Sequence, residues 1–268
     1  MVDNIVLFVS TGRTGTKSLA NFFREYFNNV ESHHQPRYSR LINVFSNMYL
    51  SNIYPHELLR KFVYKYKISD ILSCEKEYYI EANTMIYAIT DIIRELDKEV
   101  YVIHLIRDPR SFVTSYMNWF HGRAFSKIAN KVIPFWHANG VLADQINLAE
   151  WISMSEFERL CWFWKFENEV ILKMNKDYPN FISIRFEDLF ITDTLKQLQS
   201  ILSFVDLEFE NNMVDYFDIK QNVSRKGHFS KWDKWDLKKI RSLHNICSSL
   251  MNAYDYGLEE KWTKKLQL

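Results

Sequence analysis

Residues 4–18 read NIVLFVSTGRTGTKS, and this stretch decides the fold. Its first part, NIVLFVS at 4–10, is a short apolar run that ends at a glycine-containing turn, which is typical of a strand buried on both faces. From Lys17 to about Phe27, apolar residues recur at intervals of three and four, which predicts a helix with one apolar side. A strand, a tight turn and a helix in this order form the first half of a βαβ unit.

The same alternation returns further along the chain. We expect strands at 77–82, 100–106 and 181–186 and helices from Thr84, from Pro109 to about Phe120, and at 154–176, 192–205 and 236–254. Strands that alternate with helices indicate a parallel sheet. The sequence therefore predicts an α/β fold, a three-layer P-loop-like domain with a central parallel sheet flanked by helices. No internal repeat or linker interrupts the 268 residues, so we expect a single domain over 1–268.

The composition limits the class of partner and the compartment. Lys and Arg number 34 and Asp and Glu 33, which leaves a net charge of +1 and disfavours nucleic acid as the main partner. Cys74, Cys161 and Cys247 are odd in number and lack the short spacing of a zinc site or disulfide framework. No secretion signal is visible, and charges break every apolar stretch before a membrane helix is reached. We expect a cytoplasmic protein without a transmembrane segment.

The turn between the first strand and helix carries donors for an anion. Free backbone N–H groups and the positive end of the helix favour a phosphate there. Gly12 and Gly15 allow close backbone approach, and Arg13 and Lys17 add positive charges. The hydroxyl donors of the same turn are Thr14, Thr16 and Ser18. These residues predict a phosphate-binding loop, and the alternative is an ordinary glycine-containing turn.

The loop departs from the nucleoside-triphosphate pattern GxxxxGK[ST]. Counting back from Lys17, the two glycine positions are occupied by Thr16 and Thr11. The strand at 100–106 leads into Arg107, where a triphosphate enzyme would place an aspartate for magnesium. Both departures disfavour a nucleoside-triphosphate-dependent kinase and favour a leaving group that needs no metal.

At three segments the sequence resembles the PAPS-dependent sulfotransferases, which take a sulfuryl group from 3′-phosphoadenosine 5′-phosphosulfate (PAPS) and release PAP. The loop with Arg13, Gly15, Thr16 and Leu19 resembles the family's 5′-phosphosulfate loop. Arg107 and Ser115, eight residues apart, are similar to the pair that binds the 3′-phosphate. The resemblance extends over roughly residues 5–235 and implies PAPS as co-substrate, with no metal.

The third segment lies in the predicted nucleotide-binding loop at 222–235. It reads Ser224-Arg225-Lys226-Gly227 and resembles the family's C-terminal Arg-Lys-Gly loop, with Trp232 at the place of a later tryptophan. A weaker further resemblance lies at 185–189, where the sequence reads RFEDL.

PAPS carries anionic groups at both ends of its ribose, so a protein that binds it needs two cationic sites. We expect Arg107 and Arg225 to bind the 3′-phosphate, because charge-assisted hydrogen bonds contribute roughly 1.5 to 3 kcal/mol each. We expect Arg13 and Lys17 to neutralise the charge that grows on the departing phosphate.

Two residues are candidates for the base that deprotonates the acceptor hydroxyl. The segment at 79–87 resembles the Glu-Lys-Ser segment of carbohydrate sulfotransferases, which implies Glu81 as the general base, although Ala82 stands where those enzymes have lysine. His33 and His34 follow the expected second strand at the ligand-binding edge of the sheet, and His34 is the alternative base. A third possibility is that neither residue is the base.

Residues 121–153 lack a sustained period and are predicted to form an excursion on the acceptor side that contains one short helix. Its aromatic residues are candidates for a lid: Phe120, Phe125, Phe135, Trp136 and His137. The predicted reaction is sulfuryl transfer from PAPS to the hydroxyl of a small-molecule or glycan acceptor, with carbohydrate or glycolipid favoured. The alternatives are the kinase and a non-catalytic nucleotide-binding protein on the same fold.

Overall fold

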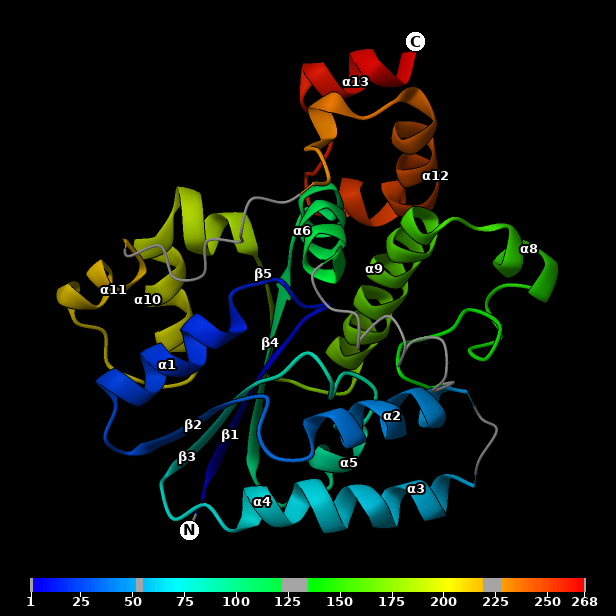
Figure 1. Cartoon of the computed structure of the whole chain (residues 1–268). Coiled ribbons are helices and arrows are strands. Elements are labelled where there is room, and N and C mark those ends of the chain that lie inside the picture. Colours follow the sequence, from blue (N-terminus) through cyan, green and yellow to red (C-terminus); the bar gives the residue numbers. More distant parts are fainter. Residues whose placement is uncertain (1, 52–54, 122–134, 219–227, 268) are drawn as a thin grey trace.

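A five-stranded parallel sheet lies at the centre of the computed structural model, which describes residues 2–51, 55–121, 135–218 and 228–267 (Figure 1). The strands are β1 (Asn4–Val9), β2 (Val30–His34), β3 (Tyr78–Ala82), β4 (Glu99–Ile106) and β5 (Phe181–Arg185). Their order in the sheet is β2-β3-β1-β4-β5, and each neighbouring pair is parallel. The predicted α/β class with a central parallel sheet is confirmed.

Helices cover both faces of the sheet, as expected for three layers (Figure 1). One face packs on α1 (Thr16–Tyr26) and α10 (Thr194–Phe204). The other face packs on α2 (Ser39–Leu50), α3 (His56–Val63), α4 (Ser69–Leu72) and α5 (Thr90–Arg94), with a π-helical turn, η1 (Tyr64–Ile68), joining α3 to α4.

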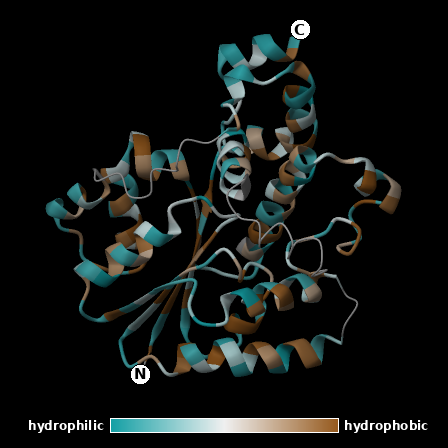
Figure 2. Cartoon of the chain, viewed as in Figure 1, coloured by the Kyte–Doolittle hydropathy of each residue, from teal (hydrophilic) through white to brown (hydrophobic). Residues whose placement is uncertain are grey.

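The apolar run of β1 is explained by these two layers. Val6 and Phe8 point into the layer of α1 and α10, whereas Ile5, Leu7 and Val9 point into the layer of α2 to α5. All five side chains are fully buried, because successive residues of a strand face opposite sides of the sheet. Figure 2 shows the apolar residues concentrated along the central strands.

A third apolar cluster joins the longer helices beyond the carboxyl end of β4. It is built from α6 (Pro109–His121), α9 (Glu156–Lys173), α12 (Leu237–Ala253) and α13 (Glu260–Gln267). The predicted start of α6 at Pro109 is confirmed, as is the position of α9. A capping box between Ser155 and Glu158 fixes the first turn of α9.

The remaining elements are short. They are α8 (Leu148–Ser153), η2 (Met174–Lys176), η3 (Asp188–Thr192), η4 (Asn211–Met213), α11 (Asp215–Asp218) and η5 (Trp232–Lys234). Helix α8 is the short helix expected inside the excursion at 121–153, of which residues 122–134 lie outside the described part. None of the helices in the described ranges combines the length and the apolar character that crossing a bilayer requires.

Two expected boundaries were wrong. No helix begins at Thr84; the helix that follows β3 begins at Thr90, because the side chain of Asn83 accepts a hydrogen bond from the amide of Met85 (2.9 Å) and forms a turn there. His33 and His34 do not follow the second strand but are its last two residues.

Candidate functional site

The loop between β1 and α1 has an unusual backbone. Gly12, Arg13 and Gly15 have φ angles of +94°, +60° and +74°, in the left-handed region. Ser10 and Thr14 lock the loop through their hydroxyls (2.7 Å), and the first turn of α1 contains no acidic residue. The predicted strand, loop and helix are therefore present, and phosphate binding by the loop stays a prediction.

Gly15 carries the strictest steric requirement in the loop. A Cβ atom at this position would lie 2.5 Å from Cζ of Phe190, in addition to the positive φ of 74°. We expect Gly15→Ala to lower the free energy of unfolding by about 1–3 kcal/mol, measured by urea denaturation.

Gly12→Ala is the matched control, because Gly12 also has a positive φ but its Cβ would meet Thr84 at an ordinary 3.8 Å. Gly12→Ala should therefore lower the free energy of unfolding by less than Gly15→Ala does. Equal losses for the two variants would contradict a steric role for Phe190.

Arg13, Arg107 and Ser115 come together although they lie about a hundred residues apart in sequence. Arg13 Nε donates to Ser115 Oγ on α6 (3.0 Å), and Arg107 Nη1 donates to the carbonyl oxygen of Arg13. The Arg107 guanidinium stacks on the ring of Phe186 (4.4 Å to the centroid). Burial lowers the pKa of Arg107 from its high ordinary value. Its buried Nε has no hydrogen-bond partner among the described residues, so a donor is left for an anion.

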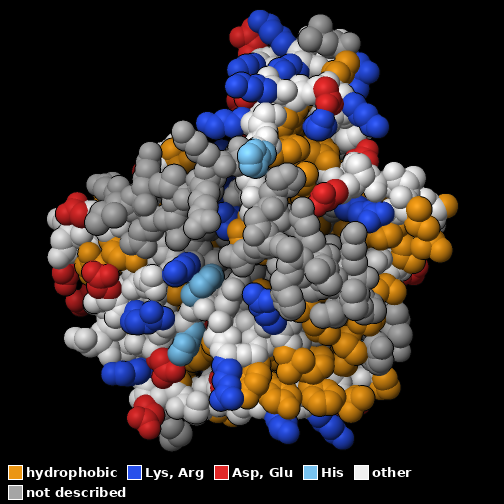
Figure 3. All heavy atoms as spheres, in the orientation of Figure 1, with side chains coloured by type: hydrophobic (Ala, Val, Ile, Leu, Met, Phe, Trp, Pro, Cys, Tyr) orange, Lys and Arg blue, Asp and Glu red, His pale blue; other side chains and the backbone are white. Residues whose placement is uncertain are grey.

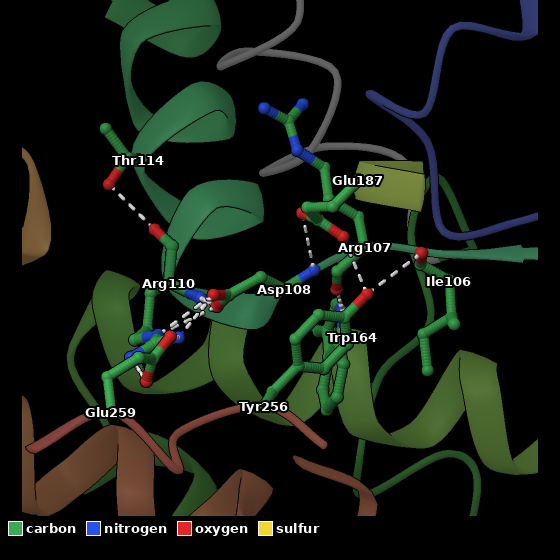
Figure 4. Close-up of polar contacts among 9 residues, drawn as sticks. All are labelled: Ile106, Arg107, Asp108, Arg110, Thr114, Trp164, Glu187, Tyr256 and Glu259. Carbon is green, nitrogen blue, oxygen red and sulfur yellow. Dashed lines mark hydrogen bonds and ion pairs between the residues drawn. The ribbon is translucent and has the colours of Figure 1, made fainter. Parts of the chain in front are cut away.

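The backbone around Arg107 is fixed on several sides (Figure 4). Trp164 Nε1 donates to the Arg107 carbonyl (2.8 Å), and the amide of Asp108 donates to Glu187 Oε1 (3.2 Å). The Tyr256 hydroxyl lies 2.7 Å from the other oxygen of Glu187. Figure 4 shows the Arg107 side chain extending away from these supporting groups. The RFEDL segment therefore contributes Glu187, which holds the start of α6.

Arg110 ties the C-terminal part of the chain to the same place (Figure 4). Its guanidinium is buried and donates to Asp108 (2.6 Å) and to Glu259 (2.7 Å). The indole rings of Trp232 and Trp262 lie 4.8 and 5.1 Å from its carbon Cζ. Sequence reasoning missed this role, because Glu259 lies 149 residues away and no spacing relates the two.

The predicted nucleotide loop at 222–235 is described only from residue 228, so Arg225, Lys226 and Gly227 lie outside the described residues. The part that is described is attached to α6. The amide of Phe229 donates to Asn118 Oδ1 (2.8 Å), and Asn118 Nδ2 donates to the Phe229 carbonyl (3.2 Å).

His34 ends β2 beside the loop. Its Nδ1 lies 3.1 Å from the carbonyl oxygen of Ala82, so in the neutral ring Nδ1 carries the proton and Nε2 is the basic atom. Burial lowers the pKa of the half-buried ring, and the positive charge of Lys17 lowers it further. The loop and the end of β2 meet at Thr84, whose hydroxyl accepts from Gln35 (3.4 Å). Figure 3 shows lysine, arginine and histidine side chains gathered near the middle of the face of the molecule that the figure presents.

Glu81 lies on β3 with an exposed fraction of 0%. Its carboxylate forms an ion pair with Lys67 of η1 and accepts from Tyr79 (2.8 Å) and from Asn83 Nδ2 (2.7 Å). Burial lowers the pKa of Lys67 to about 7, while contact with a carboxylate acts in the opposite direction. Glu81 faces the layer of α2 to α5, as does Tyr79, against which the ring of His33 packs. Sequence reasoning did not identify Lys67.

Phe120 and Phe125 of the predicted lid lie outside the described side chains. The backbone carbonyls of Phe135 and Trp136 accept from Asn47 (2.9 Å) and Asn43 (2.8 Å), which attaches this segment to α2. His137 packs edge-on against Phe163.

A buried carboxyl that the sequence did not reveal lies nearby. Glu167 of α9 is 3% exposed, and burial raises the pKa of its carboxyl well above the ordinary value. The Tyr87 hydroxyl donates to Asn47 Oδ1 (2.5 Å), and Glu167 Oε2 has no hydrogen-bond partner among the described residues.

No protein-family model and no curated protein matches the sequence. Solved structures do match. They include the sulfotransferase domain of an olefin synthase from Synechococcus PCC 7002 (14% identity, 96% of each chain, TM-score 0.51) and a mouse sulfotransferase in complex with PAP (13% identity, 98% of this chain and 88% of that one, TM-score 0.52). Another is a retinol dehydratase in complex with androsterone and PAP (14% identity, 95% and 82%, TM-score 0.51). At these identities the likeness concerns the fold, and the chain therefore has the fold of the PAP-binding sulfotransferases.

Proposed function

We propose that this protein is a PAPS-dependent sulfotransferase, which moves a sulfuryl group from PAPS to an acceptor hydroxyl and releases PAP. The observation that carries the proposal is the junction of Arg13, Arg107 and Ser115. Two hydrogen bonds join the loop after β1 to Arg107, just before α6, and to Ser115 on α6, so cationic side chains from two distant parts of the sequence lie together.

The two halves of this junction suit the two anionic ends of PAPS. The backbone amides of the loop, together with Thr14, Thr16 and Ser18, receive the 5′-phosphosulfate. Arg107 and Ser115 bind the 3′-phosphate, and Arg225, Lys226 and Gly227 are proposed to complete this second site. Arg107 is suited to this task because its Nε is buried and unpaired among the described residues.

For the chemical step we propose His34 as the general base. Its free Nε2 takes the proton of the acceptor hydroxyl, the acceptor oxygen attacks sulfur, and the bond from sulfur to the bridging oxygen breaks with PAP as the leaving group. Arg13 and Lys17 neutralise the charge that develops on PAP. The positive charge of the exposed Lys17 contributes to the lowered pKa of His34, which supports placing the base near this cation.

Glu81 was the base implied by the resemblance to carbohydrate sulfotransferases, and its surroundings favour a supporting role instead. A carboxylate that is fully buried and bonded to Lys67, Tyr79 and Asn83 would have to break these contacts to reach an acceptor. We therefore propose that Glu81 holds Asn83, and through it the turn after β3, beside the loop.

The proposed acceptor is a small molecule or glycan with a free hydroxyl. Carbohydrate or glycolipid follows from the resemblance of residues 79–87, whereas the androsterone bound to the retinol dehydratase is a steroid. A screen with labelled PAPS and alcohols of both classes separates them. The rival kinase would instead bind ATP–Mg²⁺ and ignore PAP, and a non-catalytic binder would hold PAP but transfer nothing.

Arg13→Ala is expected to lower turnover by about 10²–10³, because Arg13 acts on charge that appears in the transition state. Transfer of label from PAPS to the best acceptor of the screen measures it. Arg241→Ala, at an exposed position of α12, is the matched control and should keep full turnover. Undiminished turnover in Arg13→Ala would reject the proposed role.

A further inference from the structure

A second surface, separate from the nucleotide site, lies on α2, α3 and η1. Four of its side chains are large, apolar and exposed: Tyr38 (38%), Leu41 (37%), Leu58 (49%) and Phe62 (37%). Together with Phe45 and Tyr66 they form what we call the α2–α3 face. Figure 3 shows the apolar side chains gathered over this part of the molecule, at the lower right.

The aromatic members of the α2–α3 face form a continuous ladder across the helices. The ring centroids of Phe45 and Phe62 lie 5.1 Å apart, those of Phe62 and Tyr66 6.5 Å, and those of Tyr38 and Tyr66 5.0 Å. Contiguous exposed apolar surface of this kind marks an interaction site, whereas isolated exposed residues are common on any protein.

Basic residues border the same face. Between residues 36 and 72 the sequence holds six Lys and Arg against two acidic residues, although the chain as a whole has a net charge of +1. The members at the face form no salt bridge within the described residues; they are Arg37, Arg40, Lys61 and Lys65. Arg37 lies over the ring of Tyr38 (4.8 Å) and Lys65 over that of Tyr66 (5.4 Å), so charge and apolar surface are interleaved.

We propose that the α2–α3 face binds the surface of an anionic phospholipid bilayer. Aromatic and aliphatic side chains enter the headgroup region, while lysine and arginine beside them pair with anionic headgroups. A second copy of the chain fits less well, because a twofold contact would bring the same four cations against each other. The protein binds at the bilayer surface and does not cross it, since the contact uses side chains of several short helices and no spanning segment.

The α2–α3 face lies on an element that is also connected to the candidate site. Helix α2 begins at Ser39, five residues after His34, and its Asn43 and Asn47 hold the segment at 135–136. A bilayer on this face therefore lies on an element that also contacts the proposed acceptor-side segment. The bilayer proposal itself does not depend on the proposed sulfotransferase activity.

The test uses the full chain and sedimentation with vesicles. Vesicles of phosphatidylcholine and phosphatidylserine in equal amounts should bind the protein, and vesicles of phosphatidylcholine alone should bind it far less. Added salt should weaken the binding, because it screens the cations of the face. Lys61→Glu/Lys65→Glu and Leu58→Ser/Phe62→Ser should each reduce binding at least about tenfold.

Leu148→Ser/Ile152→Ser is the matched control. These side chains of α8 are 60% and 66% exposed and lie outside the α2–α3 face, so binding should persist. Thermal unfolding of each variant shows whether the fold is intact. The proposal is overturned if the wild type ignores phosphatidylserine, if Lys61→Glu/Lys65→Glu binds as the wild type does, or if light scattering shows a dimer that Leu58→Ser/Phe62→Ser separates.

Discussion

His34→Ala is expected to lower the turnover of sulfuryl transfer by about 10²–10⁴, the usual contribution of a positioned general base. The reason is geometric. The Ala82 carbonyl occupies Nδ1 of the ring, so Nε2 is the basic atom, and the charge of Lys17 from the first turn of α1 acts on the ring. His33→Ala is the matched control, because His33 pairs with Glu31 (2.8 Å) and packs on Tyr79.

The pH dependence of turnover follows from the same residue. The pKa of His34 lies below the ordinary histidine value of 6.5 because of burial and the charge of Lys17. A base works only when deprotonated, so kcat/KM should be flat near neutral pH and fall on the acid side, with its midpoint below 6.5. His34→Ala should lack this acid limb. Full turnover in His34→Ala, or the same loss in His33→Ala, would contradict the assignment.

Lys67→Met is expected to lower the free energy of unfolding by about 3–5 kcal/mol, measured by urea denaturation at neutral pH. The substitution removes the cation from a pair whose side chains are 3% and 0% exposed, and it leaves the Glu81 carboxylate buried without a counter-charge. Two hydrogen bonds, from Tyr79 and Asn83, cannot replace that charge.

The double variant Lys67→Met/Glu81→Leu is the control. It removes both charges and should regain most of the lost stability, because replacing a whole buried pair by apolar residues is often neutral. A double variant no more stable than Lys67→Met would contradict the pairing. If Glu81 only supports the turn after β3, turnover of the double variant should also stay within about tenfold of the wild type. If Glu81 were the base, its loss would lower turnover by about 10²–10⁴.

The parts of the fold that local sequence determines could be predicted. The apolar run of β1, the two glycines and the periodic apolar residues of α1 are all consecutive, so strand, loop and helix follow from short-range rules. The same holds for Pro109 at the start of α6. The helix expected from Thr84 failed because one side chain, Asn83, captures the amide of Met85 and delays the helix.

The parts of the fold and of the site that depend on long-range contacts could not be predicted from the sequence. Lys67 meets Glu81 because a π-helical turn places it there, and no periodicity in the sequence marks such a turn. Arg110 is held by Glu259 and Trp262 from the end of the chain. Charge alone suggested that Arg13 belongs to the leaving-group end, but its hydrogen bond to Ser115 shows that it also reaches the middle of α6.

The most direct test of two phosphate sites on one nucleotide is calorimetric titration with PAP and with adenosine 5′-phosphate, which lacks the 3′-phosphate. The wild type should bind PAP at least about tenfold more tightly, because each charge-assisted hydrogen bond contributes roughly 1.5–3 kcal/mol. Arg107→Ala should bind the two nucleotides nearly alike. Equal affinities in the wild type, or tighter binding of ATP–Mg²⁺ than of PAP, would contradict the sulfotransferase assignment.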